Sequence, residues 1–198
     1  MSSEHVVQLF DTEISRAQSV AAFAARGLAA GETALLVFRP ANSTAIVEHL
    51  EALGAAPRTA IAEGRLIVHD AGEILRSISR NGVPDRRLFL ESIVPAVRRI
   101  AQGTTRLWGS GEMVDLLAQR GEFRSALLLE QWWTELAAGI PLVMLCSYSS
   151  AHFVSTSTHS SLVEICKAHS HVRRDVQDPL GNWLLTAAHN RGGSSAPR

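Results

Sequence analysis

The stretch "EICKAHSHV", residues 164–172, holds one cysteine and two histidines within six positions. Thiolate and imidazole groups bind transition metals, and a cysteine can also form a redox-active disulfide. Cys166 and His169 are three residues apart, which places them on one face of a helix. We interpret the stretch as one wall of a ligand pocket or as a packed helix end. A metal half-site and a redox element are the competing hypotheses.

A second group of candidates lies in the run "PLVMLCSY", residues 141–148. Cys146 and Tyr148 are two residues apart on a predicted strand, so they face the same side, near the strand end where open α/β sheets bind ligands. With the two cysteines, His169 and His171 could complete a Cys2His2 site, but structural zinc sites use closely spaced ligand pairs and only C-x-x-H is local here. We therefore assign no metal and no other cofactor. A Cys146–Cys166 redox pair and two inert buried thiols stay open as alternatives.

Two glutamates and a tryptophan complete the set of candidates. Glu112 follows a predicted strand, where a carboxylate serves either as a ligand group or as a first-turn acid favoured by the helix dipole. Glu130 lies in the apolar helix "LLLEQWW", where its charge is costly unless it is paired, for example with Arg106. Trp133 belongs either to the core or to a stacking wall of the pocket. We assign no catalytic residue, and the predicted ligand-binding residues are Glu112, Glu130, Trp133, Cys146, Tyr148, Cys166 and His169.

The elements that must position these residues alternate between strand and helix. Short apolar or β-branched runs predict strands, and apolar residues at helical spacing predict helices. The predicted strands are 5–10, 33–38, 64–70, 104–109 and 141–148. The predicted helices are 13–29, one after Pro40 capped by Asn42 or Ser43, 71–80, 84–103 with a kink at Pro95, 111–120, 122–138 and 160–170. The alternation predicts an α/β domain of three layers, with helices flanking a mostly parallel central sheet.

A nucleotide-binding loop is expected after the second strand but is not present in the sequence. The segment "TALLVFRPANSTAIVEHL" reads as strand, loop and helix, and the lead-in "RGLAAGE" is typical of RecA/KaiC-like ATPases. A Walker A loop needs glycines, so that backbone amides face the phosphates, and a lysine to neutralise their charge. The loop "RPANST" has neither, although Ser43 or Thr44 could mimic the magnesium-binding hydroxyl. We do not expect ATP hydrolysis.

Composition excludes several classes of partner. Nineteen Lys and Arg residues balance nineteen Asp and Glu residues, so no positive field favours direct binding of nucleic acid or an anionic membrane. Hydrophobic residues make up 46% of the chain, which suits one compact domain. No signal peptide or membrane span is visible, so we expect a cytoplasmic location. We place the folded domain at residues 1–172 and interpret 173–198 as a tail, with a short helix followed by disorder.

Eight motifs follow one another in a fixed order: "HVVQLFD", "FAARGLAAGETALLVF", "GRLIVHDAGEIL", "NGVPDRRLF", "LWGSGEMVDLL", "ALLLEQWWTELA", "LVMLCSY...F" and "EICKAHSHV". Together they resemble the MEDS domain family, a sensory domain described in methanogens, methylotrophs and a dichloromethane-responsive transcriptional regulator. The similarity covers about residues 5–172. It implies a degenerate RecA/KaiC-like α/β fold used to sense small molecules, in some members hydrocarbon derivatives. His5 and Asp11 are also at family-like positions, and we expect His5 to bond the closing helix.

The resemblance implies a non-enzymatic sensory or regulatory domain that binds a small molecule. Because no helix-turn-helix or kinase segment accompanies it, the output is expected to travel through a signalling or transcription partner protein. A homodimer is compatible with such a role. Two alternatives stay open: a nucleotide-binding protein with a degenerate P-loop and little or no ATPase activity, and a module that only binds other proteins.

Overall fold

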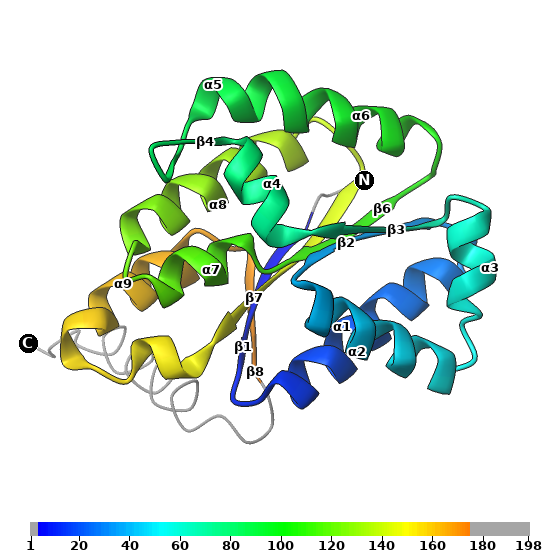
Figure 1. Cartoon of the computed structure of the whole chain (residues 1–198), viewed down its shortest axis with the longest axis horizontal. Helices are drawn as coiled ribbons and strands as arrows, with labels where there is room; N and C mark the ends of the chain where they lie inside the picture. Colours follow the sequence, from blue (N-terminus) through cyan, green and yellow to red (C-terminus); the bar gives the residue numbers. More distant parts are fainter. Residues whose placement is uncertain (1–3, 175–198) are drawn as a thin grey trace, which may run out of the picture.

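The computed structural model describes residues 4–174, which form a three-layer α/β domain (Figure 1). Its central sheet has six strands in the order β3-β2-β6-β7-β1-β8, and every neighbouring pair runs parallel. The strands are β1 (Glu4–Phe10), β2 (Thr33–Phe38), β3 (Leu66–Asp70), β6 (Leu107–Gly111), β7 (Leu142–Ser149) and β8 (His171–Arg174). The predicted fold class is confirmed. Within residues 4–174 no helix is long and apolar enough to cross a membrane.

The helices cover both faces of the sheet and create two apolar cores (Figure 1). One face carries α1 (Glu13–Ala29), α2 (Pro40–Ala52) and α3 (Pro57–Ala62). The other carries α4 (Ala71–Ser77), α6 (Val94–Gln102), α7 (Met113–Gln119), α8 (Phe123–Ala137) and α9 (Thr156–Lys167). This double cover explains the continuous apolar sequence of β2, in which every residue is buried.

The short elements between these helices correct several local predictions. The helix predicted over 84–103 is divided into α5 (Arg86–Leu88), the π-helical turn η1 (Phe89–Ile93) and α6, so the irregularity falls immediately before Pro95. Helix α2 begins at Pro40 without a side-chain cap, because proline's fixed φ suits the first helical position. The predicted caps Asn42 and Ser43 are therefore wrong. The α3 helix, the 3-10 turn η2 (Ser150–Phe153) and the small hairpin of β4 (Ser79–Arg80) and β5 (Val83–Pro84) were not predicted.

The closing segment differs from the predicted helix 160–170. Helix α9 ends at Lys167, and after a short turn β8 pairs with β1. The backbone N–H of His5 donates to Ser170 Oγ at 3.1 Å, and the N–H of Ser170 donates to the His5 carbonyl at 2.8 Å, which makes the expected link between His5 and the closing segment. The helix and disorder predicted beyond residue 174 lie outside the described residues.

The order of the strands places a topological switch point between β2 and β6. From β2 the chain passes to β3 on one side, whereas β6 pairs with β2 on the other side. Such a switch point is where open α/β sheets bind ligands. Arg39 directly follows β2 and Glu112 directly follows β6, and the N–H of Glu112 donates to the Val37 carbonyl at 3.0 Å. The fold therefore brings Arg39 and Glu112 to the same edge.

Candidate functional site

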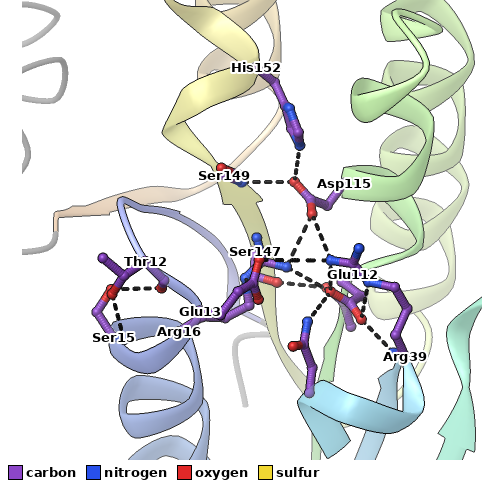
Figure 2. A network of polar contacts seen from close by, with 12 residues as sticks. Thr12, Glu13, Ser15, Arg16, Arg39, Glu112, Asp115, Ser147, Ser149 and His152 are labelled. Carbon is purple, nitrogen blue, oxygen red and sulfur yellow. Dashed lines mark hydrogen bonds and ion pairs between the residues drawn. The ribbon is translucent and has the colours of Figure 1, made fainter.

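The first polar cluster, here called the rim cluster, lies at the carboxyl edge of the sheet (Figure 2). It is centred on the carboxylate of Glu112, which is fully buried. Glu112 Oε2 accepts three hydrogen bonds: from Arg16 Nη1 at 2.6 Å, from Arg39 Nη2 at 2.9 Å and from Asn42 Nδ2 at 2.8 Å. The backbone N–H of Arg39, at the start of α2, donates to Glu112 Oε1. At this end of α2 the Arg39 amide, the Arg39 guanidinium and the Asn42 side chain are all directed at one carboxylate.

A second buried carboxylate, Asp115, extends the rim cluster (Figure 2). It accepts hydrogen bonds from Arg16 Nη1 at 3.1 Å and from the N–H of Ser149 at 2.8 Å, and its Oδ1 lies 3.0 Å from His152 Nε2. Burial alone would raise the pKa of Asp115, but the hydrogen bond from His152, the charge of Arg16 and the Ser149 amide together lower it. Asp115 is therefore ionised and shares Arg16 with Glu112.

The rim cluster surrounds the N-terminus of α2, which begins at Pro40. A helix N-terminus with guanidinium groups beside it is an anion-binding arrangement. Here the chain supplies the anion itself, because the Glu112 carboxylate accepts the Arg39 amide and both arginines. Glu112 is the N-cap residue of α7, its carboxylate accepts internal donors, and its role in binding a ligand stays a prediction. Its negative charge is balanced by donors of the protein itself.

The second polar cluster, here called the inner cluster, consists of His5, Glu130, Cys146 and His169, all buried. These residues come from β1, α8, β7 and the turn after α9. One ligand atom from each lies within 4.8 Å of all the others. His5 Nε2 is 3.1 Å from Cys146 Sγ and 3.1 Å from Glu130 Oε2. Cys146 Sγ is 3.1 Å from Glu130 Oε2, so three elements meet at one point.

The two imidazole rings of the inner cluster are oriented by hydrogen bonds on their outer sides. His5 Nδ1 lies 2.8 Å from Thr134 Oγ1, and that hydroxyl donates its own hydrogen to the Glu130 carbonyl at 3.0 Å. His5 Nδ1 must therefore be the donor. His169 Nδ1 lies 2.7 Å from the Ile165 carbonyl, which can only accept. Both rings thus carry hydrogen on Nδ1 and direct Nε2 into the cluster.

The inner cluster leaves one nitrogen without a hydrogen bond. His169 Nε2 is buried and has no hydrogen-bond partner, although it lies 3.3 Å from Glu130 Oε2. The other oxygen of Glu130, Oε1, accepts from the hydroxyl of Tyr148 at 2.8 Å. A buried polar atom without a partner is uncommon in folded proteins and calls for an explanation.

Burial and mutual proximity shift the titration of the inner cluster. Burial alone would raise the pKa of Glu130, but the neighbouring His169 and His5 lower it below its usual range. Burial and the Glu130 carboxylate raise the pKa of Cys146 and of Tyr148 well above their usual values. The thiol and the phenol therefore keep their protons and donate them to Glu130.

A small, mostly apolar cavity of about 40 Å³ adjoins the inner cluster. Its walls come from β2, β6, β7, α6, α7 and α8. A space of this size accommodates on the order of three water-sized groups. Trp133 and Cys146 both belong to the lining, and Cys146 also belongs to the inner cluster. The cavity and the cluster therefore meet at one thiol.

The predicted site residues divide into separate places. Glu130, Cys146, Tyr148 and His169 come together, Trp133 lines the cavity, and Glu112 lies in the rim cluster. Cys166 lies outside the inner cluster, and burial raises the pKa of its thiol to about 11.

The predicted partner of Glu130 was wrong. Arg106 precedes β6, at the amino edge of the sheet, and Glu130 pairs instead with His5 and His169.

Sequence reasoning missed the residues that complete both clusters. His5 was expected only to bond the closing helix, and Arg16, Arg39 and Asp115 were not singled out. The position of Arg16 could have indicated its role. It precedes Val20 by four residues, on the apolar stripe of α1, and is itself buried. An arginine on such a stripe requires a buried acid. The partners themselves lie about a hundred residues away and are set by the fold.

Comparisons with known proteins identify first the fold and then the family. The KaiC-like protein PH0186 from hyperthermophilic archaea Pyrococcus horikoshii OT3 matches with a TM-score of 0.56 at 17% identity, over 89% of this chain and 75% of that chain. This likeness shows a KaiC-like α/β fold. No curated protein matches the sequence. The sequence model of MEDS, the MEthanogen/methylotroph, DcmR Sensory domain, matches residues 4–170. The chain belongs to the MEDS family, which indicates a sensory or regulatory role.

Proposed function

We propose that this protein is a non-enzymatic sensory domain that binds a small apolar molecule in the cavity beside Cys146. The observation that carries the proposal is an apolar cavity in the core, lined by the sheet and by α6, α7 and α8. Membership of a sensory domain family supports it. Because the cavity is small and its lining mostly apolar, the fitting ligands are molecules of a few heavy atoms with at most one polar group.

The rim cluster supports a role without nucleotide chemistry. In a P-loop protein, backbone amides and a lysine bind the phosphates at a helix N-terminus. Here Glu112 competes for that position with a charge of the same sign as a phosphate. A nucleotide would have to displace a buried carboxylate from two guanidinium groups.

Signalling would require that the ligand favour one conformation over another. The cavity lies between the sheet and three helices, so a bound molecule contacts elements that can shift relative to the sheet. We infer that a partner protein recognises the changed surface, and that two copies of the chain form a dimer in some of its complexes. Chemical crosslinking with and without ligand would test both points.

Thermal unfolding of the full chain against a panel of short apolar molecules tests the proposed site. A ligand that binds only the folded state should raise the melting temperature with concentration, whereas ATP with Mg²⁺ should produce no shift. Val97→Phe, which fills the cavity from α6, should abolish the response. Val47→Phe adds the same atoms on the opposite face of the sheet and should leave the response intact. A flat response to every small molecule, or a stabilisation by ATP, would refute the proposal.

A further inference from the structure

We propose that the inner cluster is a binding site for a divalent transition-metal ion of the zinc type. The ligand atoms are Nε2 of His5, Nε2 of His169, Sγ of Cys146 and Oε2 of Glu130. Imidazole nitrogen, thiolate sulfur and carboxylate oxygen are the donors that zinc prefers, and four protein ligands give a closed tetrahedral site. The inference does not depend on the proposed sensory function.

The spacing of the ligand atoms matches a tetrahedral ion. Zinc bonds of 2.0–2.3 Å separate adjacent ligands by roughly 3.3–3.8 Å at tetrahedral angles. The three distances among His5, Cys146 and Glu130 are each 3.1 Å, and His169 Nε2 is 3.3 Å from Glu130 Oε2. All four atoms lie within 4.8 Å of one another. An ion therefore fits between them with small side-chain movements.

The proposed ligands accept or donate hydrogen bonds to surrounding atoms, as the ligands of known metal sites do with their outer-sphere partners. Metal-binding histidines usually donate the other ring N–H to an oxygen, which fixes the tautomer and the ring orientation. Both histidines do so here, toward Thr134 Oγ1 and the Ile165 carbonyl. The hydroxyl of Tyr148 holds Glu130 Oε1, which leaves Oε2 for the ion.

The unpartnered nitrogen of His169 is the observation that most directly indicates a cation. With Nδ1 engaged by the Ile165 carbonyl, His169 directs Nε2 at Oε2 of Glu130 from 3.3 Å, and Nε2 has no hydrogen-bond partner. A divalent ion between these atoms would satisfy both. Its binding would release the Cys146 proton to solvent and form a metal–thiolate bond, with no change in oxidation state.

The four ligands come from distant parts of the chain, so no local sequence motif predicts the metal site. They lie at positions 5, 130, 146 and 169, on β1, α8, β7 and the turn before β8. An ion at this point would tie the first and last strands of the sheet to α8. Because such a site exists only in the folded state, metal binding should stabilise the fold.

Metal analysis of the purified full chain with Zn²⁺ alone as the probe tests the inference. We expect one zinc per chain after dialysis, a melting temperature that rises with zinc and falls with a chelator, and a thiolate charge-transfer band when Co²⁺ replaces zinc. Cys146→Ser and His169→Gln should each weaken the affinity by on the order of 100-fold or more, and Thr134→Ala by roughly 10–100-fold. Cys166→Ser, on the same closing segment but outside the cluster, should keep wild-type affinity.

Three results would overturn the inference. The first is that the purified chain takes up no zinc and that its melting temperature changes with neither zinc nor chelator. The second is unchanged zinc affinity in Cys146→Ser and His169→Gln, which would place the metal elsewhere. If those variants do not fold, the Co²⁺ spectrum of the wild-type chain decides, and a bound Co²⁺ without a thiolate band would exclude Cys146 as a ligand. None of these measurements involves the ligand of the cavity, so the two proposals can fail separately.

Discussion

The protein contains two fully buried glutamates whose surroundings differ in kind. Glu112, in the rim cluster, is held by guanidinium groups and a backbone amide. Glu130, in the inner cluster, is held by two imidazoles, a thiol and a phenol. Guanidinium groups keep their charge at every pH at which the protein folds, whereas imidazole and thiol groups exchange protons and bind metals. The first glutamate is surrounded by groups of fixed charge, and the second by groups that could bind a metal ion.

Glu112→Ala should have the largest effect on stability. It leaves the buried Arg16 without its shortest ion pair, and removing one partner of a buried ion pair typically costs about 3–5 kcal/mol. Denaturant unfolding measures the loss. Glu91→Ala, which breaks an exposed pair with Arg87, serves as the control and should leave the free energy of unfolding nearly unchanged. A loss in Glu112→Ala no larger than in the control would contradict the description of the rim cluster.

Tyr148→Phe should weaken the inner cluster by an intermediate amount. The substitution keeps the ring and removes the hydroxyl that donates to Glu130 Oε1. A hydrogen bond to a charged group contributes about 1.5–3 kcal/mol, so the free energy of unfolding should fall by that much. Because the Tyr148 hydroxyl donates to Glu130 and, within residues 4–174, makes no hydrogen bond to the rim cluster, the same loss should appear in an Asp115→Asn background. Strong non-additivity would show that the two clusters are coupled.

Inorganic phosphate should partly rescue Glu112→Ala and leave the wild-type chain unaffected. Without the carboxylate, the start of α2, Arg16 and Arg39 form a vacated anion site. Phosphate at ten times its dissociation constant would restore about 1.4 kcal/mol. Unfolding curves with and without phosphate at constant ionic strength measure the rescue. Equal responses of the variant and the wild-type chain would argue against a filled anion site in the rim cluster.

The smallest effect should be an acid-dependent loss of stability through Asp115. Its pKa in the folded state lies below the ordinary value, so its contribution is present above the unfolded pKa of about 3.9 and is lost as the pH falls through the folded pKa. Unfolding midpoints measured from pH 5 down to pH 2 should fall less steeply for Asp115→Asn than for the wild-type chain. Parallel pH profiles of the two proteins would show that Asp115 is not stabilised as described.

Much of the fold could be predicted from local sequence because its signals are local. The run 33–38 is apolar throughout and forms β2 with those bounds, and the helix expected over 13–29 is α1. The ends of other elements shifted by a few residues. Strand β8 was missed because its four residues are mostly polar and are recruited by pairing with β1. A strand of that kind is specified by its neighbour and not by its own pattern.

The candidate site could be predicted only in part because its contacts are long-range. The same-side placement of Cys146 and Tyr148 followed from strand alternation, and both contact Glu130. Cys166 and His169 were expected on one helical face, but α9 ends at Lys167. The turn that follows directs His169 into the inner cluster without Cys166. The inclusion of His5 depends on the parallel pairing of β1 with β7, which sequence spacing does not encode.

The parallel pairing of β8 with β1 determines where a fluorescent label can be attached to follow the rim cluster. The two strands begin at one edge of the sheet and end at the other, so a label on Glu4 is separated from the rim cluster by the length of a strand. Strand β8 ends at the edge of the sheet that carries Glu112. A fluorophore on Glu4 should therefore serve as a neutral tag, and one on Arg173 should be more sensitive to events at the rim cluster.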